Sequence, residues 1–341
     1  MAGPKYYPIL KWKRGEQGAM RYLDATDQAL MFPILEVMGA AGADHRQALS
    51  HQLEKVRADA HPLGIDGRNL WAPGTGFKPL VKLCGQLQKD GHQAHPVISA
   101  LDLFANLADL SVLKGLPVVV LRLRLHIVLL DSVLGAVKAV RKAIGKAAQL
   151  HVVFDFGPIG EAPEGGLRVF VEPFVQGTLA AGDADVVAMA GGSFPISLGG
   201  FALGVKNRIR RKEWHVWQDL RQQPGCDDVR FGDFNVTNPE PQEIEDPSKM
   251  NPAAAIRYAL DGEWWLLKAR GAKTSGYDQY NTLCRALVAS QEYSGPTFSF
   301  GDKRYLFHAQ NDDKSGNFMT WRRDAASHHL VLTARRLNQL I

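Results

Sequence analysis

Short apolar runs alternate with amphipathic stretches through the first two-thirds of the chain. The run from Val118 to Leu121 is apolar without interruption, which is typical of a strand buried on both faces. Stretches with apolar residues at every third or fourth position predict helices between such runs. The pattern predicts strands at 7–12, 32–38, 96–103, 117–125, 151–156 and 185–190, and helices at 16–25, 45–59 and 131–148.

Strands that alternate with helices indicate βαβ units and a parallel sheet. Predicted strands of this kind leave two solutions, a closed (β/α)8 barrel and an open doubly wound sheet. An open sheet usually has a glycine-rich first turn, whereas the first predicted strand runs into Lys11-Trp12-Lys13-Arg14-Gly15. We therefore expect an α/β fold of the TIM-barrel-like (β/α)8 type, complete or distorted.

The pattern changes near residue 239, where Asn238-Pro239-Glu240-Pro241 is rich in turn formers. Beyond it, apolar runs at 256–260 and 263–268 flank Asp261-Gly262, which predicts a β-hairpin. A helix at 277–291, strands at 298–300 and 305–308, and a terminal helix at 324–340 follow. We expect a barrel-like domain over residues 1–238 and a smaller α+β portion over 239–341, packed on the barrel or completing it.

Composition narrows this picture only slightly. The 341 residues carry a formal net charge of +5 and a pI near 9.0, which is compatible with nucleic acid or a phosphorylated ligand but more often only keeps a protein soluble. The three cysteines are too few and too widely spaced for a disulfide framework or a zinc site. We see no signal-peptide core and no apolar run long enough for a membrane helix, so the cytoplasm is the expected location and no membrane partner is expected.

Charged side chains gather at the carboxyl ends of the predicted strands, where barrels place their sites. Strand periodicity gives Lys11 and Lys13 one face, and it gives Arg122 and Arg124 one face that points into the barrel. The strand-end set is Lys11, Lys13, Glu36, Asp102, Arg122, Arg124 and Asp155.

This set has two interpretations. Buried charges persist when they pair, so the cations and carboxylates can form an internal ionic network. Alternatively, they line a water-filled mouth in which cations bind a phosphate or carboxylate, with Glu36, Asp102 and Asp155 as acid and base groups or as ligands of Mg²⁺. The neighbouring cations oppose a metal, and no metal ligands are assigned.

Two further motifs carry weaker signals. The run from Lys206 to Lys212 holds five cations in seven residues, which is usually a solvated surface and otherwise a phosphate-contacting edge. His328 and His329 are adjacent and point in different directions, so they do not predict a zinc site.

Several segments together resemble the phage-type beta protein family of phages and bacterial genomes. They are Tyr7 to Glu16, Pro33 to Val37, Phe231 to Phe234, Arg270-Gly271 with Gln279-Tyr280, and Trp321-Arg322 with His328-His329. Phe234 stands where the family often has tyrosine. The resemblance implies no particular reaction, and it implies an association with phage–host conflict. It adds Asp233, Arg270 and Arg322 to the candidates.

The main hypothesis is a barrel that binds or acts on a phosphate-bearing or anionic ligand, a nucleotide or nucleic acid, by hydrolytic or phosphodiester chemistry if it is an enzyme. The rival is a non-catalytic interaction protein with a protein partner, whose strand-end charges form a structural ionic network. A third hypothesis is nucleic-acid binding through 206–212. The candidate catalytic residues are Glu36, Asp102, Asp155 and Asp233; the candidate ligand-binding residues are Lys11, Lys13, Arg122, Arg124, Arg270 and Arg322.

Overall fold

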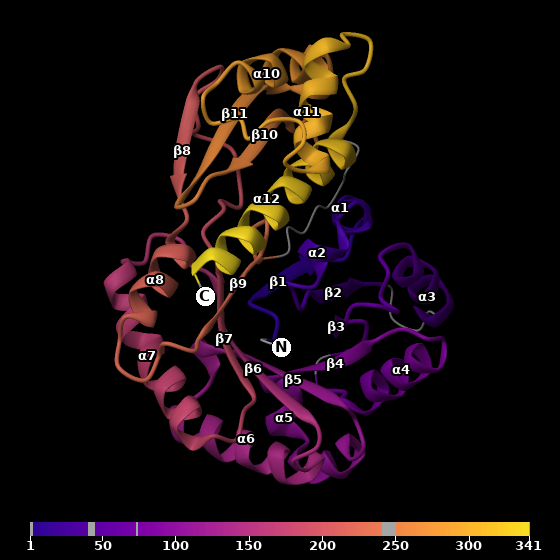
Figure 1. Cartoon of the computed structure of the whole chain (residues 1–341), viewed down its shortest axis with the longest axis vertical. Coiled ribbons are helices and arrows are strands. Elements are labelled where there is room, and N and C mark those ends of the chain that lie inside the picture. The colour runs from indigo at the N-terminus through magenta and orange to yellow at the C-terminus, as the bar shows by residue number, and fades with distance from the viewer. Residues whose placement is uncertain (1–2, 40–44, 73, 241–249, 341) are drawn as a thin grey trace.

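Eight parallel strands close into a barrel in the computed structural model, which describes residues 3–39, 45–72, 74–240 and 250–340 (Figure 1). Each strand pairs with the next around the ring, and the last pairs with the first. In order, the strands are β1 (Tyr6–Lys11), β2 (Ile34–Met38), β3 (Leu63–Asn69), β4 (Ala94–Ser99), β5 (Val118–Arg124), β6 (Gln149–Pro158), β7 (Val186–Gly192) and β9 (Arg230–Asp233). The predicted TIM-barrel-like (β/α)8 fold is confirmed.

Helices follow most strands and form the outer layer of the barrel (Figure 1). Leucines and valines that point outward from the strands pack against these helices in one large apolar core. The helices are α1 (Arg14–Arg21), α2 (Ala25–Gln28), α3 (His45–Lys55), α4 (Lys78–Lys89), α5 (Ala100–Ala105), α6 (Leu130–Ile144), α7 (Glu164–Ala181) and α8 (Lys212–Arg221), with 3₁₀ turns η1 (Leu107–Leu113) and η2 (Leu125–Ile127).

A second, antiparallel sheet stands outside the ring of barrel helices, at the top of Figure 1. The predicted hairpin is confirmed as β10 (Ala253–Ala259) and β11 (Glu263–Gly271), and β8 (Lys206–Arg210) adds a third strand. The sheet packs with α9 (Ala272–Ser275), α10 (Gln279–Val288) and α11 (Phe300–Gln310). Helix α12 (Phe318–Leu340) runs from this sheet to the barrel and packs along α1.

The division of the chain at residue 238 stays a prediction. The small sheet includes β8, which precedes that position, and β9 returns to the barrel after it. Residues 241–249, part of the polar stretch after the predicted boundary, lie outside the described residues. Over the described ranges, no helix combines the length and apolar character needed to cross a membrane.

Three predicted strands are wrong in part or in whole, because serine caps begin helices in these stretches. The predicted strand at 96–103 ends at Ser99, whose hydroxyl accepts from the Asp102 backbone N–H at 3.2 Å and so starts α5. The predicted strands at 298–300 and 305–308 are replaced by α11, where Ser299 accepts from the Asp302 backbone N–H at 3.1 Å. Both sites read Ser-x-x-Asp, a helix-start signature that outweighs the apolar runs around it.

Candidate functional site

The barrel interior is apolar along most of its length and ionic at its carboxyl end. Inward residues of the strands, among them Ile9, Ile34 and Val120, form a separate buried cluster. Two residues further along each strand, the inward positions are charged. They are Lys11, Glu36 and Asp66, which are direct register neighbours on β1, β2 and β3. The strand pattern therefore delivers charges to one layer at the barrel mouth.

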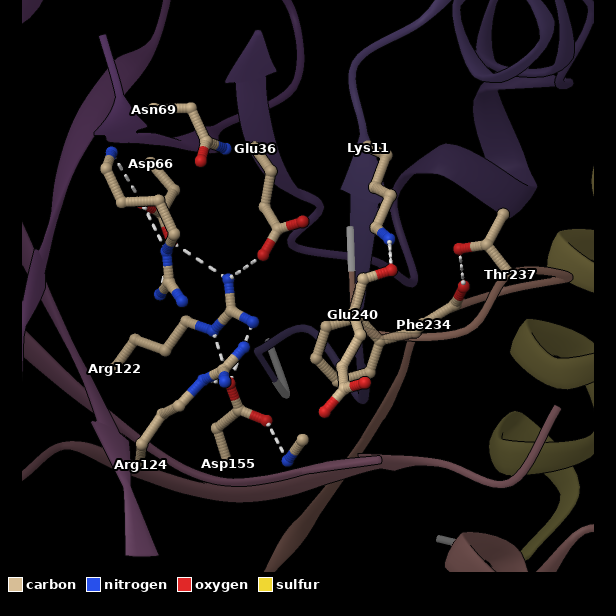
Figure 2. A network of polar contacts seen from close by, with 12 residues as sticks. Lys11, Glu36, Asp66, Asn69, Arg122, Arg124, Asp155, Phe234, Thr237 and Glu240 are labelled. Carbon is tan, nitrogen blue, oxygen red and sulfur yellow. Dashed lines mark hydrogen bonds and ion pairs between the residues drawn. The ribbon is translucent and has the colours of Figure 1, made fainter. Parts of the chain in front are cut away.

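Arg122 lies at the centre of this layer and is fully buried (Figure 2). Its Nη1 lies 2.7 Å from Glu36 Oε1 and 2.9 Å from Asp66 Oδ2, and its Nη2 lies 2.7 Å from Asp155 Oδ2. The Phe234 ring lies against the guanidinium, with its centroid 5.2 Å from Cζ. We call Arg122, Glu36, Asp66 and Asp155 the Arg122 lattice.

The lattice keeps its two aspartates, Asp66 and Asp155, ionised. Burial alone would raise the pKa of Asp155, but Arg122 and Arg124 outweigh it and lower that pKa below its ordinary value. The Asp66 carboxyl behaves in the same way, because Arg68 and Arg122 offset its burial and lower its pKa. Burial opposes the charge of Arg122 itself, yet the three carboxylates raise its pKa. These aspartates are therefore poor proton donors and good anchors for the arginine.

A cavity of about 220 Å³ opens above the lattice, and six cations line it. Two carboxylates, Glu36 and Glu240, also face it. We call it the cation pocket; its cations are Lys11, Lys13, Arg68, Arg124, Arg257 and Arg322.

The cations differ in how far they are neutralised. Arg68 pairs with Asp66 at 2.8 Å, and Arg124 lies 3.5 Å from Asp155. Lys11 instead donates to the carbonyl oxygen of Asn238 at 2.7 Å. It also donates to the carbonyl oxygen of Glu240 at 2.6 Å (Figure 2). Among the residues that the structure describes, no carboxylate forms an ion pair with Lys11, Lys13 or Arg257.

The pocket is unfavourable for its own charges. Burial lowers the pKa of Lys11, although Glu36 opposes that change. Burial and the neighbouring Arg322 lower the pKa of Arg257 to about 9. A lowered pKa of a base means that the fold destabilises its cationic form. An anion in the pocket would remove that cost.

Helix α1 positions Arg322 at the rim. Gly15 lies on the face of α1 that meets α12, and a Cβ there would lie 3.2 Å from Cγ of Arg322. Gly18 faces the next side chain, Arg323, in the same way. Small residues three apart in α1 thus leave room for the arginine stems of α12. Glu16, buried between them, lies 3.9 Å from the Arg322 guanidinium.

The structure brings together some of the predicted site residues and separates others. Lys11, Lys13, Glu36, Arg124 and Arg322 line the cation pocket, and Arg122 and Asp155 lie below it in the lattice. Asp102 lies on α5 and lines a neighbouring cavity of about 330 Å³ with Trp71 and Phe77. Arg270 is exposed and lines a third cavity of about 730 Å³ with Phe318 and Trp321, between the small sheet, α12 and the loop after β7.

Asp233 lies apart from these groups. It points outward from β9 and accepts from the Tyr6 hydroxyl at 2.6 Å. Its other oxygen lies 2.7 Å from His329 Nε2 and 3.3 Å from Arg211 Nη2. Burial would raise the pKa of Asp233, but His329 and Arg211 lower it to about 2. This buried cluster joins the barrel to α12, and a catalytic role for Asp233 stays a prediction.

Neither weaker motif joins the pocket. The cations of β8 alternate with less exposed residues, and Lys206, Arg208 and Arg210 pair with Glu292, Glu263 and Glu164. His328 lies 2.8 Å from Asp302 in a different buried network from that of His329. Within the described ranges, no three His, Cys, Asp or Glu side chains are placed to hold a metal ion. In the Arg122 lattice, the guanidinium lies between the three carboxylates.

Sequence reasoning missed Asp66, Arg68 and Arg257. The first two lie on β3, which was not predicted, although Ile65-Asp66-Gly67-Arg68 follows the same alternation as the other strands. Arg257 lies on β10 of the small sheet, and its Nη1 donates to the Val236 carbonyl at 2.8 Å. Nothing in the sequence places β10 beside the barrel mouth.

Solved structures show distant similarity to this chain. A candidate lyase/mutase from Burkholderia cenocepacia J2315 is 12% identical, with 69% of this chain and 78% of that chain covered and a TM-score of 0.36. The biosynthetic arginine decarboxylase from Campylobacter jejuni is 10% identical, with 98% of this chain covered and a TM-score of 0.39. The chain spans 56% of the length of that decarboxylase.

Of the two sequence comparisons, one identifies a family and the other finds no match. No curated protein matches the chain. A profile of the family described as Beta protein matches residues 6–335, nearly the whole chain. All the segments that resemble this family in the sequence analysis lie within that range. They include the pocket residues Lys11, Glu36 and Arg322. The chain therefore belongs to the Beta protein family.

Proposed function

We propose that the cation pocket binds a phosphate group of an anionic ligand, a nucleotide or a nucleic acid strand. The observation that carries this proposal is the excess of six cations over two carboxylates in a cavity of about 220 Å³. One of those carboxylates, Glu36, already accepts from Arg122. The carboxylates that line the pocket are therefore too few to neutralise its cations.

Chemistry favours phosphate in this position. Arginine presents a planar fork of donors that matches two phosphate oxygens, and lysine adds a compact charge. The lowered pKa values of Lys11 and Arg257 add a thermodynamic reason, because an anion would restore the stability that these cations lose on burial.

The rival hypothesis of a structural ionic network applies to the Arg122 lattice and not to the cation pocket above it. The Arg122 lattice is buried and internally paired, so its charges hold the strands together at the mouth. The cations above it face open space. We infer that the lattice is the floor and that the cation pocket is the binding surface. A role in phage–host conflict stays a prediction.

Thermal unfolding in the presence of inorganic phosphate, nucleotides, sugar phosphates and divalent ions tests this proposal. A bound ligand at 100 times its Kd should stabilise the wild-type protein by about 2.7 kcal/mol. Lys13→Ala and Arg322→Ala should lose most of the phosphate-dependent rise in Tm. Lys303→Ala, an exposed lysine on α11, is the matched control and should keep it. Equal shifts in all four proteins, or none in any, would contradict the proposal.

Hydrolytic chemistry has its own test at Glu36, the candidate base that lines the cation pocket. If the protein hydrolyses a bound phosphoester, Glu36→Gln should keep the ligand-induced rise in Tm and lose turnover by about 100-fold or more. Turnover that is unchanged in Glu36→Gln would exclude Glu36 as the base.

A further inference from the structure

The cation pocket is the middle one of three cavities that share walls. Arg68, Asn69 and Arg124 line both it and the cavity of about 330 Å³ that contains Trp71, which we call the Trp71 pocket. Ile196, Arg257 and Arg322 line both it and the cavity of about 730 Å³ that contains Trp321, which we call the Trp321 pocket. A pair of arginines therefore stands at each junction.

The middle cavity is too small for a whole ligand. Small-molecule sites usually occupy about 300–1,000 Å³, and the cation pocket has about 220 Å³. The two outer cavities, at about 330 and 730 Å³, reach that range. A ligand whose phosphate lies in the middle would extend into one outer cavity or into both.

Each outer cavity offers an aromatic surface. In the Trp71 pocket, Trp71 is partly exposed, and the buried Phe77 lies beside it in the lining. In the Trp321 pocket, Phe318 is partly exposed and packs edge-on against Trp321, with ring centroids 5.2 Å apart. The Trp321 ring is in turn stacked on the ring of Tyr280, with centroids 4.4 Å apart, and this contact holds the Trp321 ring in place.

The outer cavities also carry polar groups that an acyl chain would leave unused. Ser99 and Asp102 line the Trp71 pocket, and Asn251 and Arg270 line the Trp321 pocket. Nucleobases present both a flat face for stacking and an edge of donors and acceptors. A base in each outer cavity would therefore use both kinds of surface.

We propose that the three cavities together bind a dinucleotide unit, with one base in the Trp71 pocket, one in the Trp321 pocket and the linking phosphate in the cation pocket. This inference rests on the proposed function, because it assigns the same phosphate site. The unit can be a free dinucleotide or two adjacent nucleotides of a single strand, which share this chemistry.

Binding titrations with four probes test the assignment: inorganic phosphate, adenosine monophosphate, the dinucleoside monophosphate ApA, and hexa-adenylate. ApA should bind at least tenfold more tightly than adenosine monophosphate. Trp71→Ala and Phe318→Ala should each weaken ApA roughly fivefold to 100-fold, the usual loss for one stacked base. Neither variant should change phosphate binding. Hexa-adenylate that binds more tightly than ApA identifies a strand as the source, and equal or weaker binding identifies a free dinucleotide.

Matched variants separate stacking from folding. Phe170→Ala removes an exposed aromatic ring on α7 that lines none of the three cavities, and it should leave all four affinities unchanged. Trp71→Phe keeps a flat ring and should restore most of the ApA affinity lost in Trp71→Ala. If Trp71→Ala or Phe318→Ala does not fold, Trp71→Leu and Phe318→Leu take their place, because leucine retains apolar volume without a flat face.

The outcomes distinguish the two proposals. If ApA binds no more tightly than adenosine monophosphate while Lys13→Ala still weakens phosphate, the dinucleotide assignment is wrong and the phosphate site stands. Loss of ApA affinity that Trp71→Phe does not restore also overturns the stacking role. If no probe binds the wild-type protein, the phosphate site is wrong, and the dinucleotide assignment falls with it.

Discussion

Arg122 and Arg124 are two residues apart on one strand and face the same side, yet they have different roles. Arg122 is fully buried and meets three carboxylates. The side chain of Arg124 is 27% exposed, and among the described carboxylates its ion pair is with Asp155, at 3.5 Å. One step of the strand repeat thus separates a buried charge that is paired with three carboxylates from a partly exposed charge that lines the pocket.

The first prediction concerns that difference. Arg122→Met should destabilise the protein by about 3–5 kcal/mol, because it leaves buried carboxylates without their cation. Arg124→Met should cost about 1 kcal/mol or less, as exposed pairs usually do. Urea unfolding at neutral pH measures both. Similar midpoints for Arg122→Met and the wild-type protein would show that the lattice does not stabilise the fold.

The second prediction concerns the histidines at the far end of the barrel interior. Burial lowers the pKa of His95 and of His151 to about 4. The unfolded chain takes up these protons near pH 6.5, whereas the folded protein resists them until about pH 4. Folding stability should therefore be fully present above pH 6.5 and fall as the pH drops towards 4, by about 3 kcal/mol for each histidine at most.

Urea unfolding between pH 4 and 7 measures this dependence. His151→Gln should flatten the curve, because it removes one of the groups that gain protons on unfolding. His51→Gln changes an exposed histidine on α3 and should leave the curve as it is. A curve that is equally steep in His151→Gln would assign the acid sensitivity to other groups.

At the scale of elements, the run of cations on β8 is neutralised by ion pairs with glutamates. Its cations alternate outward along the strand, and Lys206, Arg208 and Arg210 each meet a glutamate. All three glutamates lie at least 46 residues along the chain from the cations they meet. The sheet edge is therefore a paired surface rather than a free cationic one.

The third prediction follows from this pairing. Replacing Lys206, Arg208 and Arg210 together with glutamine should change oligonucleotide affinity by less than about threefold, because these charges are already neutralised by partners. Filter binding or fluorescence anisotropy with hexa-adenylate measures it. Loss of binding in this triple variant, with Lys13→Ala unaffected, would move the nucleic-acid site from the cation pocket to β8.

At the scale of the whole molecule, the pocket is built by parts that are far apart in the chain. The barrel supplies Lys11 and Arg124, α12 supplies Arg322, and the small sheet supplies Arg257. Figure 1 shows the small sheet and the upper part of α12 outside the ring of barrel helices. The charge excess arises only where these parts meet.

The fourth prediction tests the excess of positive charge in the pocket through the salt dependence of single-strand binding. If about three pocket cations contact phosphates of a single strand, the plot of log K against log salt concentration should have a slope of roughly −2. Lys13→Ala should reduce the slope by roughly 0.7, and Lys303→Ala should not change it. A slope near zero in the wild-type protein would mean that binding does not depend on these cations.

The two barrel strands that the pattern did not predict share a cause. In β3 a Cβ on Gly64 would lie 2.5 Å from Val97 Cγ2, and in β9 a Cβ on Gly232 would lie 2.8 Å from the Tyr7 carbonyl oxygen. Neighbouring strands require glycine at these inward positions, and glycine weakens the local strand signal. Missing β3 also hid Asp66 and Arg68.

The sequence by itself determined the alternation of strands and helices, the terminal helix, the hairpin and the inward direction of Arg122, because these follow from local periodicity; the absence of a glycine-rich first turn then favoured the barrel over the open sheet. It also contained the Ser-x-x-Asp signals of α5 and α11, which apolar runs obscured. Only the tertiary structure decided which charges pair. Arg122 and Arg124 look alike in sequence, and depth in the barrel distinguishes them. Asp233 and Asp155 look alike as well, and they lie on opposite faces of the barrel wall. Pairing depends on distances between segments far apart in the chain, and local periodicity carries no information about those distances.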